Sequence, residues 1–214
     1  MEYKIADIRR EFSKKKLKPE LLNKNPVKQF ENWLNEAINA EVNEPTAMCM
    51  ATVRSDGQPT TRVLLLKGIE SNQFIFYTNY NSQKSRELEQ NPKCSLNFYW
   101  PELERQVNIQ GTIKKTDKAT SDAYFKTRPY KSRIGAWASP QSQPIPSRNF
   151  IKIEFAKYAA KFLGKDVPRP PHWGGFSLNP NIIVFWQGRP NRLHDRVRYT
   201  LQEKDKWIME RLAP

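Results

Sequence analysis

Cysteine and histidine are scarce in this 214-residue chain, with two of each, and this scarcity excludes several kinds of site. Cys49 and Cys94 each lie in a strand-like run, so we expect two buried free thiols and no disulfide framework. His172 and His194 are the only imidazoles, and no cysteines cluster. A zinc site needs three or four such ligands close together, so we expect no metal site.

Long hydrophobic runs and the common nucleotide and nucleophile motifs are also missing. No apolar run approaches the roughly 20 residues of a membrane span, and residues 1–12 lack the apolar core of a secretory signal. No P-loop, GxGxxG fingerprint or GxSxG elbow occurs. Because a membrane span and a signal are missing, we expect a cytoplasmic protein without a membrane partner. The length predicts a single domain over residues 1–214, with a mobile N-terminal arm at 1–24.

Positive charge is abundant: 36 Lys and Arg against 22 Asp and Glu give a formal net charge of +14. This excess predicts an anionic partner, either nucleic acid or a phosphorylated small molecule. The charge is spread along the chain, with one compact run at 14–18, and no helix-turn-helix, zinc-finger or RNP-type motif accompanies it. Phosphorylated small molecules therefore explain the charge as well as nucleic acid does.

Hydrophobic periodicity predicts a mainly antiparallel β protein with appended helices. Asn25 caps a helix that begins at Pro26 and ends near Val42. Strands are expected at 47–54, 60–67 and 74–78, forming a meander, and then at 94–99, 106–115, 182–187, 196–199 and 207–212. Further helices are expected from the Ser82 cap to 91, at 116–125, 133–138 and 147–162. So many antiparallel strands favour a closed or half-closed barrel, because closure removes exposed edges.

Candidate ligand contacts gather near the C-terminus and around one apolar strand. In an extended segment Arg192, His194 and Arg196 share one face, near the aromatic Trp186, although a solvated surface strand explains that pattern equally well. The RVLLLK strand begins with Arg62 and ends with Lys67, whose positions differ in parity, so the two side chains face opposite sides of the strand unless a bulge intervenes. Further candidates for phosphate contacts are Lys84, Arg128 and Ser132.

The motifs RVLLLK, YTN followed by SQK, LERQV, SRIGAWAS with the following QS, WGGF, FWQG and RLHDR stand in a family-specific order. From about Ile5 to Pro214 the chain resembles the pyridoxine (pyridoxamine) 5'-phosphate oxidases. The resemblance implies an α+β, mainly antiparallel FMN-binding split β-barrel with appended helices. It also implies a homodimer with FMN at the interface. The implied reaction oxidises pyridoxine 5'-phosphate or pyridoxamine 5'-phosphate with O2 to pyridoxal 5'-phosphate and H2O2, the last step of vitamin B6 cofactor synthesis and salvage.

The same resemblance assigns roles by position. It places FMN contacts at Arg62, Val63, Leu64, Leu65, Leu66, Lys67, Tyr77, Thr78, Gln83, Lys84, Gln106, Gln141, Ser142, Trp186 and Arg196. Substrate contacts fall at Arg9, Arg10, Glu11, Phe12, Lys67, Tyr124, Arg128, Ser132, Arg192, Leu193 and His194. The catalytic pair is Arg192, which holds the C4' substituent and guides the departing proton, with His194 assisting.

One position departs from the family pattern. Gln83 stands where relatives commonly carry an arginine, so one contact with the FMN phosphate is missing or replaced, and we expect weaker flavin retention. Two alternatives stay open from the sequence: a related split-barrel flavin protein that uses another reductant, and a nucleic-acid binder without flavin.

Overall fold

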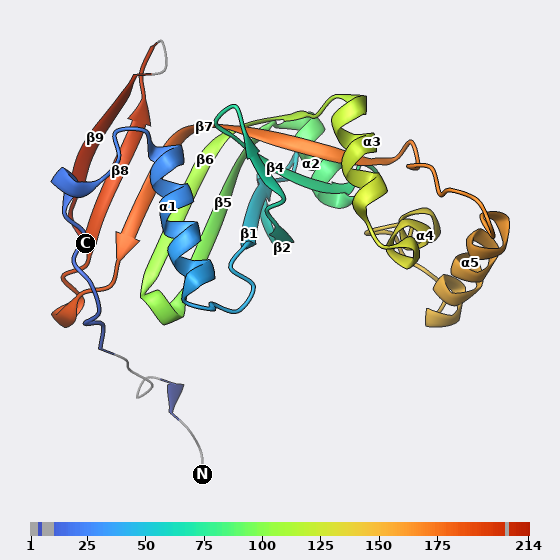
Figure 1. Cartoon of the computed structure of the whole chain (residues 1–214), viewed down its shortest axis with the longest axis horizontal. Helices are drawn as coiled ribbons and strands as arrows, with labels where there is room; N and C mark the ends of the chain where they lie inside the picture. The colour runs from blue at the N-terminus through green and yellow to red at the C-terminus, as the bar shows by residue number, and fades with distance from the viewer. Residues whose placement is uncertain (1–3, 6–10, 204–205) are drawn as a thin grey trace. The chain divides into compact units, whose positions relative to one another are not determined.

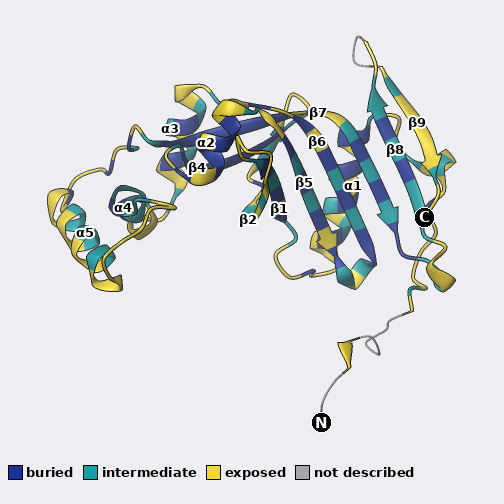
Figure 2. Ribbon diagram, turned by 180° about the vertical axis from the view of Figure 1, so that it is seen from behind, coloured by how far each residue is buried: buried dark blue, intermediate teal, exposed yellow. Residues whose placement is uncertain are grey.

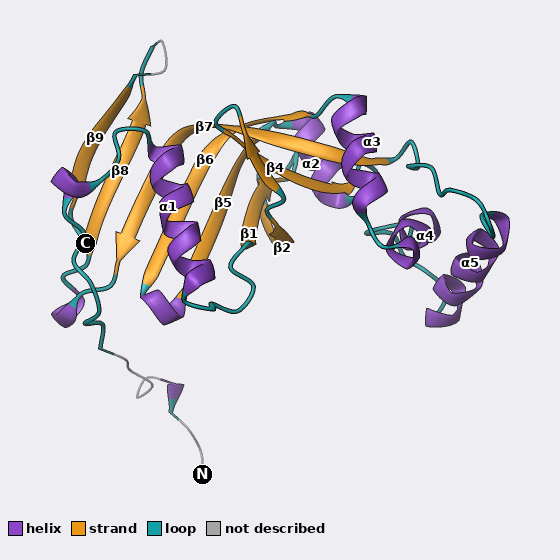
Figure 3. Cartoon of the chain, in the orientation of Figure 1, coloured by secondary structure: helices purple, strands orange, loops and turns teal. Residues whose placement is uncertain are grey.

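A computed structural model of the chain describes residues 4–5, 11–203 and 206–214 (Figure 1). The helices in these residues are α1 (Pro26–Asn39), α2 (Gln83–Gln90), α3 (Lys118–Thr127), α4 (Tyr130–Ala138) and α5 (Arg148–Lys161). The strands are β1 (Ala47–Val53), β2 (Pro59–Leu65), β3 (Gly68–Glu70), β4 (Gln73–Asn79), β5 (Lys93–Trp100), β6 (Arg105–Lys115), β7 (Trp173–Gln187), β8 (Asp195–Leu201) and β9 (Trp207–Leu212) (Figure 3). The predicted mixture of antiparallel strands and helices is confirmed, within a few residues at most boundaries.

The strand order is β2-β1-β5-β6-β7-β4-β3, with β8 pairing β7 and β9. The expected meander is wrong in its third strand, because β4 pairs with β7 and β3 and not with β2. The reason is local: β2 ends at Leu65, and the N–H of Lys67 donates to the carbonyl of Ile75 at 2.8 Å. The chain there enters a second hairpin, β3–β4, whose turn residues Ser71 and Asn72 both have positive φ.

Strand β7 is longer than the sequence predicts. Only its second half, 182–187, was expected, because Gly174, Gly175 and Pro180 are poor strand formers. The first half pairs with β4 from Trp173 to Leu178, and the second half pairs with β8. The glycines have a steric purpose, since a Cβ on Gly175 would lie 2.8 Å from the Tyr77 ring on β4.

Contacts divide the chain into two interleaved compact units. Unit 1 comprises Met1–Met50, Ser95–Gly111 and Pro180–Pro214, and unit 2 comprises Ala51–Cys94 and Thr112–Asn179. Each unit is described by itself below.

In unit 1, helix α1 supplies much of the core. Asn25 caps it as predicted, its side chain accepting from the N–H groups of Val27 and Lys28. Phe30 and Trp33 are buried, with ring centroids 4.8 Å from Phe98 and 5.0 Å from Phe185, respectively. This confirms both aromatic residues as core residues, although α1 ends at Asn39, before the expected Val42.

In unit 2, a buried cluster of Phe125, Ile134, Phe162, Val167 and Trp173 anchors helices α3 and α4. Figure 2 shows the contrast with α5, which has no buried residue. None of the helices in the described residues is long and apolar enough to cross a membrane.

The cysteine expectation is half right. Cys94 is buried and burial raises the pKa of its thiol to about 12, but Cys49 is exposed. Strand β1 alternates, so Cys49 faces outward while its neighbours Met48 and Met50 fill the core.

Gly175→Ala tests the close approach of β7 to β4. The new Cβ would lie 2.5 Å from Thr116 Oγ1 and 2.8 Å from Tyr77 Cε1, so we expect unfolding to become easier by about 1–3 kcal/mol. Gly135→Ala in α4 is the control, because nothing lies within 4 Å and alanine favours helix. Thermal melts should show a lower Tm for the first variant and an equal or higher Tm for the second; equal melting of both would contradict this account.

Candidate functional site

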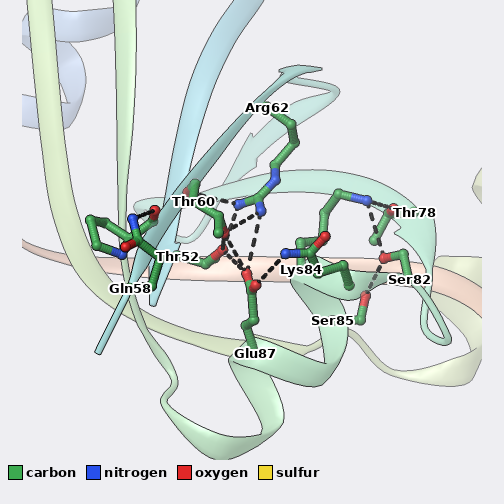
Figure 4. A network of polar contacts seen from close by, with 11 residues as sticks. Thr52, Gln58, Thr60, Arg62, Thr78, Ser82, Lys84, Ser85 and Glu87 are labelled. Carbon is green, nitrogen blue, oxygen red and sulfur yellow. Dashed lines mark hydrogen bonds and ion pairs between the residues drawn. The ribbon is translucent and has the colours of Figure 1, made fainter. Parts of the chain in front are cut away.

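Within the described residues, Lys84 is a buried cation without a directly bonded carboxylate. It lies in the first turn of α2, is 5% exposed, and its Nζ donates to Thr78 Oγ1 and Ser82 Oγ, each at 3.1 Å (Figure 4). Burial and, to a smaller extent, the charge of Arg62 lower the pKa of Lys84 to about 8, while Glu87 opposes the shift. A desolvated ammonium held by neutral hydroxyls is well suited to bind an anion.

Ser82 occupies the expected N-cap position of α2, but its hydroxyl does not cap the helix. It lies 3.1 Å from Ser85 Oγ and accepts from Lys84. The Ser82 side chain therefore accepts a hydrogen bond from the Lys84 ammonium and does not accept one from the N–H groups at the start of the helix.

Arg62 on β2 is fixed in a second part of the same network (Figure 4). Its guanidinium donates to Thr52 Oγ1 at 2.5 Å and Thr60 Oγ1 at 2.7 Å, and pairs with Glu87 at 3.3 Å. Both hydroxyls in turn donate to Glu87 Oε2, and Gln83 donates to Oε1 at 2.8 Å. Burial raises the pKa of Glu87, but these hydrogen bonds and the charge of Arg62 outweigh it, so the carboxyl stays ionised.

A loop residue and β4 complete this part of the site. Thr78 Oγ1 donates to Gln141 Oε1 at 3.3 Å, which joins the predicted Gln141 to the Lys84 network. Ser142 is exposed and has a positive φ of 65°. Gln83 is exposed but turned back onto Glu87.

The remaining RVLLLK residues follow the edge strand β2 and the turn after it. Val63 and Leu65 are exposed, Leu64 is half-buried and Leu66 is buried. Lys67 is exposed and lies beyond β2. The opposite-face prediction for Arg62 and Lys67 assumed one uninterrupted strand, and that assumption fails because β2 ends at Leu65.

An aromatic stack positions the predicted substrate residues of unit 2. Tyr77 and Tyr124 stack at 3.8 Å between centroids, and Tyr77 stacks on Trp173 at 5.6 Å. The guanidinium of Arg128 lies 4.5 Å from the Trp173 ring, and its Nη1 is buried without a hydrogen-bond partner among the described residues. Burial raises the pKa of Tyr77 to about 12, so this ring stays a neutral hydroxyl donor.

Arg128 takes its position from the residue that follows it. Pro129 disfavours helical geometry at the preceding residue, so α3 stops at Thr127 and Arg128 is extended. Ser132 follows, exposed, in the first turn of α4. A buried guanidinium N–H without a partner among the described residues is suited to bind a phosphate.

In unit 1, three rings lie close together, and one of them, Phe12, packs against Gly188. Trp186 and His194 have centroids 4.7 Å apart, and Phe12 lies edge-on to both at 5.6 Å. A Cβ on Gly188 would lie 2.8 Å from Phe12, so glycine lets the Phe12 side chain approach. The N–H of Arg189 donates to His194 Nδ1 at 3.1 Å, so the proton of the neutral ring is on Nε2.

The shared-face prediction for Arg192, His194 and Arg196 is wrong at its first residue. Arg192 ends a 3-10 turn (Pro190–Arg192) with φ of 60°, and β8 begins only at Asp195. Arg192 and Leu193 are exposed on that turn. Arg196 does lie opposite Trp186 in the β7–β8 ladder and donates to the carbonyl of Ala213.

Unit 1 also contains buried polar residues that the sequence prediction missed. Arg105 on β6 donates to Gln187 Oε1 at 3.0 Å and to Glu36 at 2.9 Å, and lies 4.2 Å from the Trp33 ring. Gln187 Nε2 donates to the carbonyl of Glu104 at 3.1 Å. Their only sequence signal was their place beside the predicted Gln106 and Trp186, in LERQV and FWQG.

The described part of the expected N-terminal arm is held in unit 1. Glu104 Oε2 accepts from the N–H groups of Ser13 and Lys14, each at 2.9 Å, and Asp195 accepts from that of Leu17. The predicted Glu11 is exposed, and the predicted Arg9 and Arg10 lie outside the described residues.

The predicted residues therefore form two groups. Unit 2 brings together Arg62, Thr78, Lys84 and Gln141, and it also contains the stack of Tyr77, Tyr124 and Arg128. Unit 1 brings together Phe12, Trp186 and His194, with Gln106 half-buried on β6. Within the described residues no group of three or more His, Cys, Asp or Glu could hold a metal ion.

Comparison with known proteins gives consistent matches along the chain. Residues 34–162 match the family described as Pyridoxamine 5'-phosphate oxidase, and residues 173–214 match the Pyridoxine 5'-phosphate oxidase C-terminal dimerisation region. The chain is 55% identical over 214 residues to a pyridoxine/pyridoxamine 5'-phosphate oxidase of Chromobacterium violaceum, covering 100% of both. It is 55% identical over 210 residues to that of Bacteroides thetaiotaomicron, covering 98% of this chain and 99% of the relative.

Solved structures show the same fold. PhzG from Burkholderia lata, in complex with tetrahydrophenazine-1-carboxylic acid, superposes with a TM-score of 0.88 at 32% identity, covering 94% of this chain and 100% of that one. A pyridoxamine 5'-phosphate oxidase-related, FMN binding protein from Nostoc punctiforme has a TM-score of 0.70 at 19% identity, covering 88% and 97%. The expected fold class, a mainly antiparallel split β-barrel with appended helices, is confirmed.

The His194 hydrogen bond predicts a tautomer. Because the Arg189 N–H donates to Nδ1, long-range ¹H–¹⁵N spectra of the neutral ring should show the proton on Nε2. The second histidine, His172, is removed by His172→Gln, which leaves one imidazole to assign. A ring protonated on Nδ1 would contradict the structure at this site.

Proposed function

The chain belongs to the pyridoxine/pyridoxamine 5'-phosphate oxidase family, and from this premise we propose that it uses FMN and O2 to oxidise pyridoxine 5'-phosphate or pyridoxamine 5'-phosphate. The products are pyridoxal 5'-phosphate and H2O2. The observation that carries the proposal for this chain's own residues is the buried Lys84, whose ammonium is held by two hydroxyls at a family cofactor position. A buried ammonium of this kind is stabilised by the charge-assisted hydrogen bonds that a phosphate accepts.

The residues present fit FMN. Lys84 and Arg62 supply the positive charge for its phosphate, where charge-assisted hydrogen bonds contribute about 1.5–3 kcal/mol each. Gln106 and Gln141 carry amides that can both donate and accept, as the polar edge of a flavin ring requires. Trp186 offers an aromatic surface on the same sheet face as Arg196.

The substrate phosphate is assigned to a different set of groups. Arg128 has a buried Nη1 that lacks a partner among the described residues, and its guanidinium carbon lies 4.5 Å from the centroid of the Trp173 ring. Tyr124 and Ser132 add hydroxyl donors, and the exposed Lys67 adds a flexible charge. Two separate cationic groups agree with two phosphorylated ligands.

When bound, FMN supplies the redox chemistry, taking a hydride from the substrate's C4' and passing the electrons to O2. The protein's task is to place C4' and handle its proton. Nδ1 of His194 accepts a hydrogen bond from the N–H of Arg189, so the Nε2–H of His194 is the donor available to a C4' oxygen or nitrogen. Arg192, exposed on its turn, holds the C4' substituent and guides the departing proton.

A homodimer with FMN at the subunit interface fits the distribution of these residues. The C-terminal dimerisation region begins at Trp173, and Trp186, Arg192 and His194 all lie within it. We infer that these residues of one copy complete the site that Arg62 and Lys84 of the other copy begin. FMN that binds only the paired state should also tighten dimerisation.

Visible spectra of the FMN-supplemented protein without oxygen test the proposed function. Pyridoxine 5'-phosphate should bleach the flavin, and air should restore its colour with formation of H2O2. Bound flavin that stays oxidised would indicate another reductant, and a protein that retains no flavin would favour the nucleic-acid alternative.

Lys84 predicts the pH dependence of FMN binding. Since its pKa is about 8 before the phosphate binds, Lys84 loses its charge above that pH, and binding must then take up a proton. The Kd for FMN should rise up to about tenfold per pH unit above about pH 8, while the phosphate stays a dianion. Lys84→Met should bind weakly with a flat profile from about pH 7.5 to 9.5. A flat profile in the unaltered protein would contradict the role of Lys84.

Arg192→Leu should separate catalysis from cofactor binding. The residue lies on an exposed turn, so we expect its loss to reduce kcat at least about tenfold while FMN content stays near that of the unaltered protein. Steady-state kinetics and flavin absorbance measure the two effects. Unchanged turnover would remove Arg192 from the mechanism.

A further inference from the structure

A carboxylate lies inside the cationic group that we assign to the FMN phosphate. Glu87 is 4% exposed, and its Oε2 accepts from Thr52 at 2.5 Å and Thr60 at 2.8 Å and pairs with Arg62 at 3.3 Å. Its hydrogen bonds hold it in the charged form. An anion-binding site would gain positive potential without this group, so its presence needs an explanation.

The explanation lies in the protein before FMN binds. Lys84 is buried, the Arg62 side chain is only 19% exposed, and the charge of Arg62 disfavours that of Lys84. Glu87 interacts with both cations. It forms an ion pair with Arg62 on β2, and its charge favours the charged form of Lys84 on the same helix, α2. Uncompensated buried charges destabilise a fold, and a buried counter-ion offsets that cost.

We propose that Glu87 is an internal counter-ion of the cofactor-phosphate site, which stabilises the site without FMN and lowers its affinity for the FMN phosphate. The inference rests on the proposed FMN function. Once the phosphate is bound, the two cations have a dianion nearby, and Glu87 then repels it. Stabilisation of the protein without FMN and repulsion of the bound phosphate both weaken FMN binding.

Gln83 takes part in this arrangement. Its amide donates to Glu87 Oε1 at 2.8 Å, one helical turn along α2, so residue 83 is directed to the carboxylate. An arginine there would pair with Glu87 before it met a phosphate. We therefore attribute the expected weaker flavin retention to Gln83 and Glu87 together, and not to Gln83 alone.

Glu87→Gln isolates the charge from the geometry. The amide has the size of the carboxylate and keeps one acceptor oxygen, while Thr52 and Thr60 still accept from the Arg62 guanidinium. The matched control is Glu89→Gln on the same helix, because Glu89 is exposed and pairs with Lys115 at 2.9 Å away from this network.

Fluorescence titrations of the apoproteins with FMN and with riboflavin, at one pH and ionic strength, test the proposal. We expect Glu87→Gln to bind FMN about tenfold more tightly, equivalent to about 1.4 kcal/mol, with an unchanged Kd for riboflavin, which lacks the phosphate. The apoprotein of this variant should melt at a lower temperature and be stabilised more by FMN. Glu89→Gln should bind FMN within about twofold of the unaltered protein.

Weaker or unchanged FMN binding by Glu87→Gln would overturn the proposal, as would equal tightening for riboflavin. If that variant does not fold, Gln83→Arg gives the answer: FMN binding should tighten less than about threefold, because the new guanidinium would be paired with Glu87, and tightening of tenfold or more would overturn the proposal. An unaltered protein that binds no FMN would overturn the proposed function as well, and this outcome separates the two failures.

Discussion

Desolvated positive charge is the constraint on which the functional site depends. Lys84 is buried among hydroxyls, and Arg62 is held by two threonines and one carboxylate. Burying cations is costly unless an anion compensates them, so a fold keeps such a group only with a partner at hand. Here Glu87 is the partner inside the protein and the cofactor phosphate is the proposed partner from outside. Helix α2 carries both Lys84 and Glu87, so under the two proposals this helix links the stability of the apoprotein to cofactor binding.

Glycine and aromatic residues occur together twice along β7 and directly after it. In unit 2, Gly175 allows the Tyr77 ring to lie against the strand, and Trp173 stacks on that ring and holds Arg128. In unit 1, the same strand carries Trp186, and Phe12 packs close to Gly188, which directly follows the strand. The two motifs WGGF and FWQG thus serve the same purpose: a small residue lets an aromatic ring come close to the strand.

Sequence patterns predicted most of the elements, because helices and strands leave local signals, whereas the ligand contacts of the cations remain predictions. The final strand at 207–212, the Asn25 cap and the core residues Phe30 and Trp33 were predictable from periodicity and capping. The first half of β7 was not, since its glycines and proline oppose strand formation and tertiary contacts override them. Glu87 and Arg105 were missed for another reason: a buried charge looks like a surface charge until its distant partners are known, and Thr52 and Glu36 are such partners.

We propose that residues of unit 1 from one copy and of unit 2 from the other copy form each active site of a homodimer. This claim is tested most directly by a heterodimer that pairs an Arg192→Leu subunit with a Lys84→Met subunit, purified through two different tags. If the sites are shared in this way, one site contains both alterations and the other contains neither, so the heterodimer should retain about half the activity of the unaltered dimer. An inactive heterodimer, with both parent homodimers also inactive, would contradict the claim.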